Sequence, residues 1–107
     1  MTKKYELTDE TILFKGRTLH RIRALKDFGT VKAGDLGGFI ESEENLSPDG
    51  ECWIYDNAKV FDGARVFEEA QVKDQVIVCL KARIWGDSIL RGSTWVSDSE
   101  TFQKAGK

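Results

Sequence analysis

The sequence holds few side chains that could carry out covalent chemistry. It has one histidine, His20, and two cysteines, Cys52 and Cys79. These three side chains cannot supply the four ligands of a zinc site, and no histidine accompanies a serine as the base of a nucleophile. Asp56 and Asp74 could share a cation weakly, but solvated turns explain them better. We therefore expect no catalytic residue, no metal and no cofactor.

Length and composition indicate one small domain. The chain has 107 residues, of which 40% are hydrophobic and 32% charged, a composition that folds. A net charge of −2 argues against a specific nucleic-acid partner. No apolar run approaches the ~20 residues of a membrane helix, so no membrane partner is expected. The start lacks the apolar core of a secretory signal, and two cysteines are too few for a disulfide framework, so we expect a reducing cytoplasm.

A six-residue repeat fills the second half of the sequence. From residue 52 an aliphatic residue recurs every six positions, and a small or short residue stands two positions before it. Residues two apart on a strand share a face, so both sets are predicted to point inward, with bends between the strands. Helical spacing does not fit. The aliphatic positions are Ile54, Val60, Val66, Val72, Val78, Ile84, Leu90 and Val96, and the short ones are Cys52, Ala58, Ala64, Ala70, Val76, Ala82, Ser88 and Thr94.

The segment Ala58–Val66 resembles the hexapeptide repeat of left-handed parallel β-helices. In that family three hexads form one triangular coil. The resemblance implies an all-β fold, a short left-handed parallel β-helix of about three coils. The whole chain also resembles small phage and prophage proteins of uncertain function, through the segments Ile22–Phe28, Val31–Glu41 and Glu44–Ser47.

The front of the chain is predicted to cap this β-helix. Residues 1–40 are expected to form an N-terminal β capping module built on a hairpin within residues 12–25, with a short helix as the alternative for the second half of that segment. Residues 41–99 then form the hexapeptide-repeat β-helix, and residues 100–107 a polar tail. We expect the three parts to form one cooperative domain.

Stacking the coils divides the outward side chains among three faces. The second face is largely apolar, and exposed apolar patches mark interfaces, so we predict that it binds a second chain. In the alternative, the front module folds over this face within one chain. The third face carries arginines and aromatic rings, which predict a second binding strip or, alternatively, ordinary surface stabilisation. The predicted interface is Phe61, Ile77, Cys79 and Trp95, and the second strip is Arg65, Phe67, Arg83 and Trp85.

These features predict a binding role. Many hexapeptide-repeat proteins are trimeric acyltransferases with a histidine base on a coil, whereas His20 lies outside every hexad. We therefore expect a non-enzymatic module that associates with itself, as a dimer or trimer, and binds a host protein. The phage resemblance implies the cytoplasm of a bacterial host cell and a target such as a bacterial defence system of the CRISPR type. The alternatives are a scaffold that polymerises or joins a virion, and a degenerate relative of the hexapeptide acyltransferases.

Overall fold

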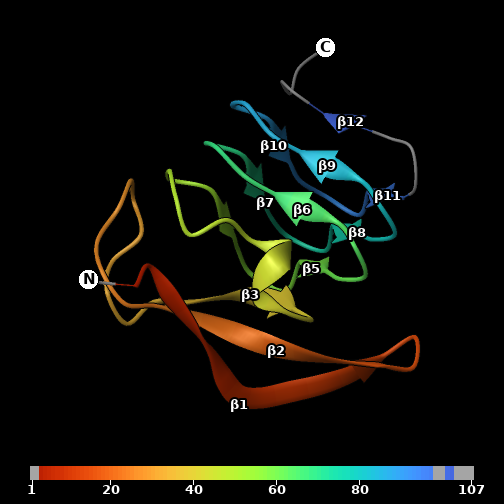
Figure 1. Cartoon of the computed structure of the whole chain (residues 1–107), viewed down its shortest axis with the longest axis horizontal. Helices are drawn as coiled ribbons and strands as arrows, with labels where there is room; N and C mark the ends of the chain where they lie inside the picture. Colours follow the sequence, from red (N-terminus) through yellow and green to blue (C-terminus); the bar gives the residue numbers. More distant parts are fainter. Residues whose placement is uncertain (1–2, 98–100, 103–107) are drawn as a thin grey trace.

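The computed structural model describes residues 3–97 and 101–102 and is almost entirely β (Figure 1). A long hairpin lies below a stack of short strands, and a 3-10 helix, η1 (Glu43–Asn45), lies where the two parts meet. The stack is a parallel β-solenoid of about three turns, which confirms the predicted fold class.

Three parallel sheets form the walls of the solenoid. Each sheet pairs residues one coil apart, so that Trp53 lies beside Gln71 and Gln71 beside Ile89. Outward residues therefore stack on three faces, as predicted. The first face is β4 (Trp53–Ile54), β7 (Gln71–Val72) and β10 (Ile89–Leu90), the second is β5 (Lys59–Val60), β8 (Ile77–Val78) and β11 (Trp95–Val96), and the third is β6 (Arg65–Val66), β9 (Arg83–Ile84) and β12 (Thr101–Phe102).

The two predicted sets of inward residues line the interior. Every aliphatic position from Ile54 to Val96 is buried, with at most 7% of its surface exposed. The short residues are buried from Cys52 to Ser88, but Thr94 is exposed because it lies in the last coil that the structure describes. Burial of a large aliphatic side chain contributes about 1.5–3 kcal/mol, so these rows are the main source of stability.

The bends of the solenoid repeat with the same period. One residue in each bend has a positive φ, a conformation that suits glycine and aspartate. The carboxylate at one corner accepts a hydrogen bond from the corner of the next coil: Asp74 N–H donates to Asp56 Oδ2 at 3.1 Å, and Gly92 N–H to Asp74 Oδ2 at 2.9 Å. The corners with positive φ from Asp56 onward are Asp56, Asp62, Glu68, Asp74, Leu80, Gly86 and Gly92.

The front of the chain forms a hairpin, as predicted, but a longer one that begins at Tyr5 instead of residue 12, and its second half is a strand and not a helix. Strands β1 (Tyr5–Phe14) and β2 (Arg17–Ala24) pair across the turn Lys15–Gly16, in which both residues have positive φ, as the strand twist requires. Strand β2 also pairs with β3 (Leu36–Ile40), and β3 pairs in parallel with β5. The hairpin therefore extends the sheet of the second face.

The hairpin also covers the outer surface of the second face. Leu19 is buried with Phe61 and Cys79, which are only 3% and 5% exposed. The rings of Phe14 and Phe61 meet edge to face with centroids 5.6 Å apart. The alternative in which the front module folds over this face is therefore the arrangement observed. The hairpin gains this position because it buries apolar side chains that would otherwise face water.

Some predicted segments are only partly described. The boundary predicted at residue 40 falls at the end of β3. Of the predicted tail, only Thr101 and Phe102 are described, as β12, and the rest of 100–107 lies outside the described residues. Within the described part of the chain, no helix is long and apolar enough to cross a membrane.

Candidate functional site

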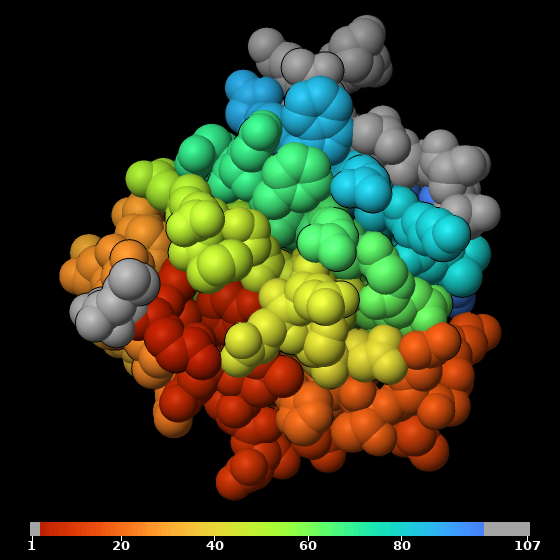
Figure 2. All heavy atoms as spheres, in the orientation of Figure 1, coloured from red at the N-terminus to blue at the C-terminus, as the bar shows by residue number. Residues whose placement is uncertain are grey.

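The third face of the solenoid carries a cavity of about 330 Å³. Figure 2 shows this face, with the yellow segment around η1 beside the green and cyan strands β6 and β9. One side of the cavity consists of residues from these strands, and the other of η1 and the segment after it. We call this cavity the arginine groove; its lining residues are Glu43, Glu44, Ser47, Pro48, Arg65, Val66, Phe67 and Arg83.

The strand register brings the two arginines of the groove together. Arg65 of β6 is the direct partner of Arg83 of β9, and neighbouring strands lie about 4.8 Å apart. Both side chains are exposed because alternate residues of each strand face the core. Phe67 and Trp85 stand two residues further on, with parallel rings whose centroids are 6.3 Å apart. The structure thus brings the four residues of the predicted second strip together, and three of them line the groove.

The guanidinium groups of the groove have no carboxylate partner in the described part of the chain. No acidic oxygen of residues 3–97 or 101–102 lies within 4.0 Å of a side-chain nitrogen of Arg65 or Arg83. Glu43 is paired with Lys3 at 3.2 Å, whereas no ion pair of this kind engages Glu44 within these residues. The groove can therefore attract an anion through its arginines and accept a proton at Glu44.

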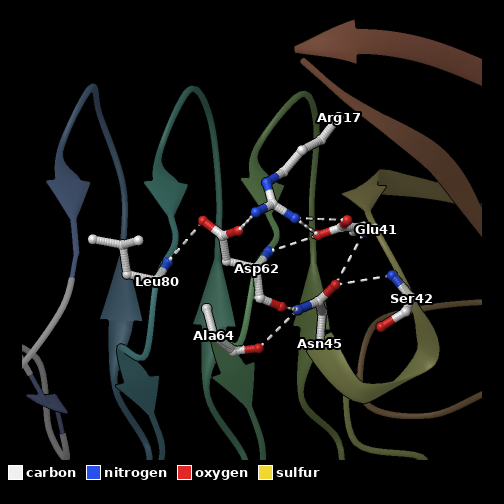
Figure 3. Close-up of polar contacts among 7 residues, drawn as sticks. All are labelled: Arg17, Glu41, Ser42, Asn45, Asp62, Ala64 and Leu80. Atoms are coloured by element: carbon white, nitrogen blue, oxygen red, sulfur yellow. Dashed lines mark hydrogen bonds and ion pairs between the residues drawn. The ribbon is translucent and has the colours of Figure 1, made fainter. Parts of the chain in front are cut away.

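A polar network holds the η1 side of the arginine groove against the solenoid (Figure 3). Arg17 of β2 donates to both carboxylate oxygens of Glu41, at 3.0 and 2.8 Å, and forms an ion pair with Asp62. The backbone N–H of Asp62 also donates to Glu41 Oε1 at 2.9 Å. These contacts join the hairpin, the residues before η1 and the corner after β5.

Asn45, at the end of η1, is fully buried and uses its whole amide group (Figure 3). Its Oδ1 accepts from the backbone N–H groups of Glu41 and Ser42, at 3.0 and 2.9 Å. Its Nδ2 donates to the carbonyl oxygens of Asp62 and Ala64, at 3.1 and 2.8 Å. Because all four hydrogen bonds of the amide are made within the protein, Asn45 positions η1 and is not available to a ligand.

The side chains first considered for covalent chemistry lie outside the groove. His20 is half-buried on β2, with Nδ1 3.2 Å from the carbonyl oxygen of Thr8. Cys52 lies inside the solenoid, as predicted, and Cys79 lies outside it but beneath the hairpin. Both cysteines are free, and burial raises the pKa of both thiols, which makes them poor nucleophiles.

A buried lysine, Lys4, was not anticipated from the sequence. Its Nζ donates to the carbonyl oxygens of Ser47 and Asp49, at 3.3 and 3.5 Å, and to Cys52 Sγ at 3.3 Å. Burial lowers the pKa of its ammonium group. Lys4 borders a second cavity of about 460 Å³, but its ammonium group is already bound to the loop after η1. Lys3 and Lys4 are adjacent in the sequence, and nothing around them indicates which of the two is buried.

The predicted interface remains exposed only in part. The hairpin of the same chain buries Phe61 and Cys79, and Ile77 is half-buried. Trp95 is 49% exposed, with its ring centroid 6.5 Å from that of Phe14. Burial removes Phe61 and Cys79 from any surface that a second chain could contact. Contact with a second chain through Trp95 stays a prediction.

Fold and groove together describe a parallel β-solenoid, built on a six-residue repeat, with a charged site on one face. The chain is 33% identical over 109 residues to an uncharacterized acetyltransferase, YdcK, of Escherichia coli (strain K12). The alignment covers 94% of this chain and 32% of the relative, so the chain spans about a third of the relative's length. No family model matches the chain.

This relative overturns the expectation that the protein is not an enzyme, because its name points to an enzyme family. The expectation depended on the lack of a histidine in the hexads. That reasoning was too narrow, since carboxylates also serve as general bases. The resemblance to phage proteins gains no support from these comparisons and stays a prediction.

Proposed function

We propose that this chain acts in acetyl transfer and that the arginine groove binds one of the reactants. The observation that carries the proposal is the 33% identity to an acetyltransferase along nearly the whole chain. The groove supports it because one cavity of about 330 Å³ combines two guanidinium groups with the carboxylate of Glu44. Cations can orient an anionic reactant, and a carboxylate can remove a proton from it.

In this proposal Arg65 and Arg83 orient an acceptor that carries an anionic group and an amine, and Glu44 acts as the base. The amine nitrogen attacks the thioester carbonyl carbon of acetyl-coenzyme A. A carbon–nitrogen bond forms, the carbon–sulfur bond breaks, and the amine proton passes to Glu44, which then donates it to the departing sulfur so that coenzyme A leaves as the thiol. His20 has no part in the reaction because it lies outside the groove.

The test measures acetyl-coenzyme A binding by calorimetry and coenzyme A release by chromatography, with a panel of amines that carry an anionic group. We expect Glu44→Gln to slow release by about 100-fold, since general bases typically contribute that much. His20→Asn is the matched control and should leave release unchanged. Absence of both binding and release would overturn the proposal. Loss of release in His20→Asn with retention in Glu44→Gln would overturn the assignment of the base.

A second role is contact with another copy of the chain. The observation that favours it is the exposure of Trp95, at 49%, at the end of the second face, with Leu13 near the hairpin turn 77% exposed. We propose that these residues mediate self-association, as a dimer or trimer. A host-protein target, including a bacterial defence system, stays a prediction that affinity capture from a host lysate can test. A polymerising scaffold also stays a prediction.

A further inference from the structure

The arginine groove presents two guanidinium groups that can bind a dianion, although its lining also includes Glu44 and Glu43, the latter paired with Lys3. Arg65 and Arg83 place two positive charges on neighbouring strands, and within residues 3–97 and 101–102 neither has an acidic partner. A guanidinium group binds phosphate through two parallel N–H bonds, so two adjacent groups can share the oxygens of one phosphate. A carboxylate ligand would neutralise only one of the two charges.

The remaining lining of the groove suits a ring attached to that anion. Phe67 is half-buried and offers an aromatic surface, and Pro48 adds an apolar one. Ser47 Oγ accepts a hydrogen bond from Asp49 N–H at 3.1 Å, which leaves the hydroxyl proton available to a ligand. The volume of about 330 Å³ lies at the lower end of the range for small-molecule sites, so the groove fits one ring and one phosphate.

We infer that the arginine groove binds a phosphate monoester of a flat ring, with the phosphate on Arg65 and Arg83 and the ring against Phe67. Only one part of this inference rests on the proposed function, namely that the bound phosphate monoester is a reactant of acetyl transfer. Binding itself requires no acetyl donor. Glu44 opposes the phosphate because it adds a negative charge to the same cavity.

Calorimetric titration with phenyl phosphate, in the absence of acetyl-coenzyme A, tests the inference. Phenyl phosphate should bind more tightly than inorganic phosphate, which lacks the ring, and than benzoate, which carries one charge. Arg65→Gln and Arg83→Gln should each weaken binding about tenfold, the effect of losing one hydrogen-bonded charge. Arg91→Gln is the matched control, since Arg91 is exposed and follows β10 on another face.

Glu44→Gln should tighten phenyl phosphate binding severalfold, because it removes the opposing charge. The same variant should slow acetyl transfer if Glu44 is the base, so the two roles of Glu44 predict changes of opposite sign. Circular dichroism establishes that each variant is folded; all four substituted side chains are exposed.

Several outcomes would overturn the inference. These are unchanged affinity in both arginine variants of the groove, equal weakening by Arg91→Gln, and tighter binding of benzoate than of phenyl phosphate. Failure of phenyl phosphate to bind while acetyl transfer is observed would refute the inference alone. Specific binding without any acetyl transfer would support the inference and refute the proposed function.

Discussion

The backbone N–H of Leu80 donates a hydrogen bond to Asp62 Oδ2, 3.3 Å away on the preceding coil (Figure 3). Both residues occupy corners with positive φ, 58° at Leu80 and 60° at Asp62. Aspartate tolerates this conformation because its short side chain bonds locally, whereas leucine does not. Leu80 also gains little from burial, since its side chain is 46% exposed. The hydrogen bond from Leu80 N–H therefore helps to stabilise a leucine at a corner whose positive φ disfavours this residue type.

Replacing Leu80 by asparagine should therefore stabilise the protein. Asparagine accepts positive φ and keeps the backbone N–H that bonds to Asp62, so we expect the free energy of unfolding to rise by about 1 kcal/mol. Urea denaturation measures this change. Leu80→Ala is the control, because it removes the exposed side chain but keeps the backbone cost. Equal stabilisation by both variants would contradict this explanation, because it would show that the exposed leucine side chain, and not its positive φ, lowers the stability of the wild-type protein.

The period of six residues was enough to predict the solenoid, its three faces and the pairing of Arg65 with Arg83. This succeeds because a strict repeat fixes which residues point inward and which stack on one another. The same repeat could not decide what covers Phe61 and Cys79. Apolar residues on an outer face call for a cover, but their pattern does not distinguish a second chain from a hairpin of the same chain.

The opposite wall of the arginine groove could not be predicted because it lies outside the repeat. The positions of Glu43 and Glu44 depend on η1, which Asn45 ties to the backbone of Asp62 and Ala64. These are long-range contacts of an irregular segment, and no local spacing encodes them. Glu44, the carboxylate that we propose as the base, lies on this wall, so the repeat could not indicate it. The expectation of a non-enzymatic role, which considered only a histidine as base, was wrong.

Substitution of Asn45 should destabilise the protein strongly. Asn45→Ala leaves two N–H groups and two carbonyl groups without the amide that pairs them, and one such buried loss costs ~1–3 kcal/mol. We expect a loss of at least ~2 kcal/mol in urea denaturation. Asn57→Ala, at an exposed corner, is the control; it removes one exposed hydrogen bond, donated by Arg21 at 3.1 Å, and should cost less than ~1 kcal/mol. Similar losses in both variants would contradict the structural role of Asn45.

Stability should fall in alkaline solution. Burial raises the pKa of Cys52 and Cys79 above the ordinary value of 9.0, and that of Tyr5 above 10.0. The unfolded chain releases these protons at lower pH than the folded chain, so their contribution is complete below pH 9.0 and is lost as pH rises. Lys4 and Lys59 act in the opposite sense, because burial lowers the pKa of both ammonium groups and so favours the folded state as pH rises toward 10.5.

Three groups oppose two, and the pKa shift of Tyr5 is the largest of the five, so the net free energy of unfolding should decrease from pH ~8 to pH ~10.5. Urea denaturation at several pH values measures the slope. Cys79→Ala removes one of the three groups and should make the slope shallower. A free energy that stays constant or rises over this range would contradict the assignment.

Self-association, if it uses the end of the second face, should depend on Trp95 and not on Phe61. Trp95→Gln changes a side chain that is 49% exposed, so the fold should persist while the molar mass from light scattering falls to that of a monomer. Phe61→Ala opens a cavity beneath the hairpin and should cost ~3–5 kcal/mol of stability. Tyr55→Gln, on the first face, is the control and should leave the mass unchanged. Two results would exclude this interface: a wild-type protein that is monomeric at every concentration, or a Trp95→Gln variant with unchanged mass. In either case the exposed ring of Trp95 would make no contact with a second chain.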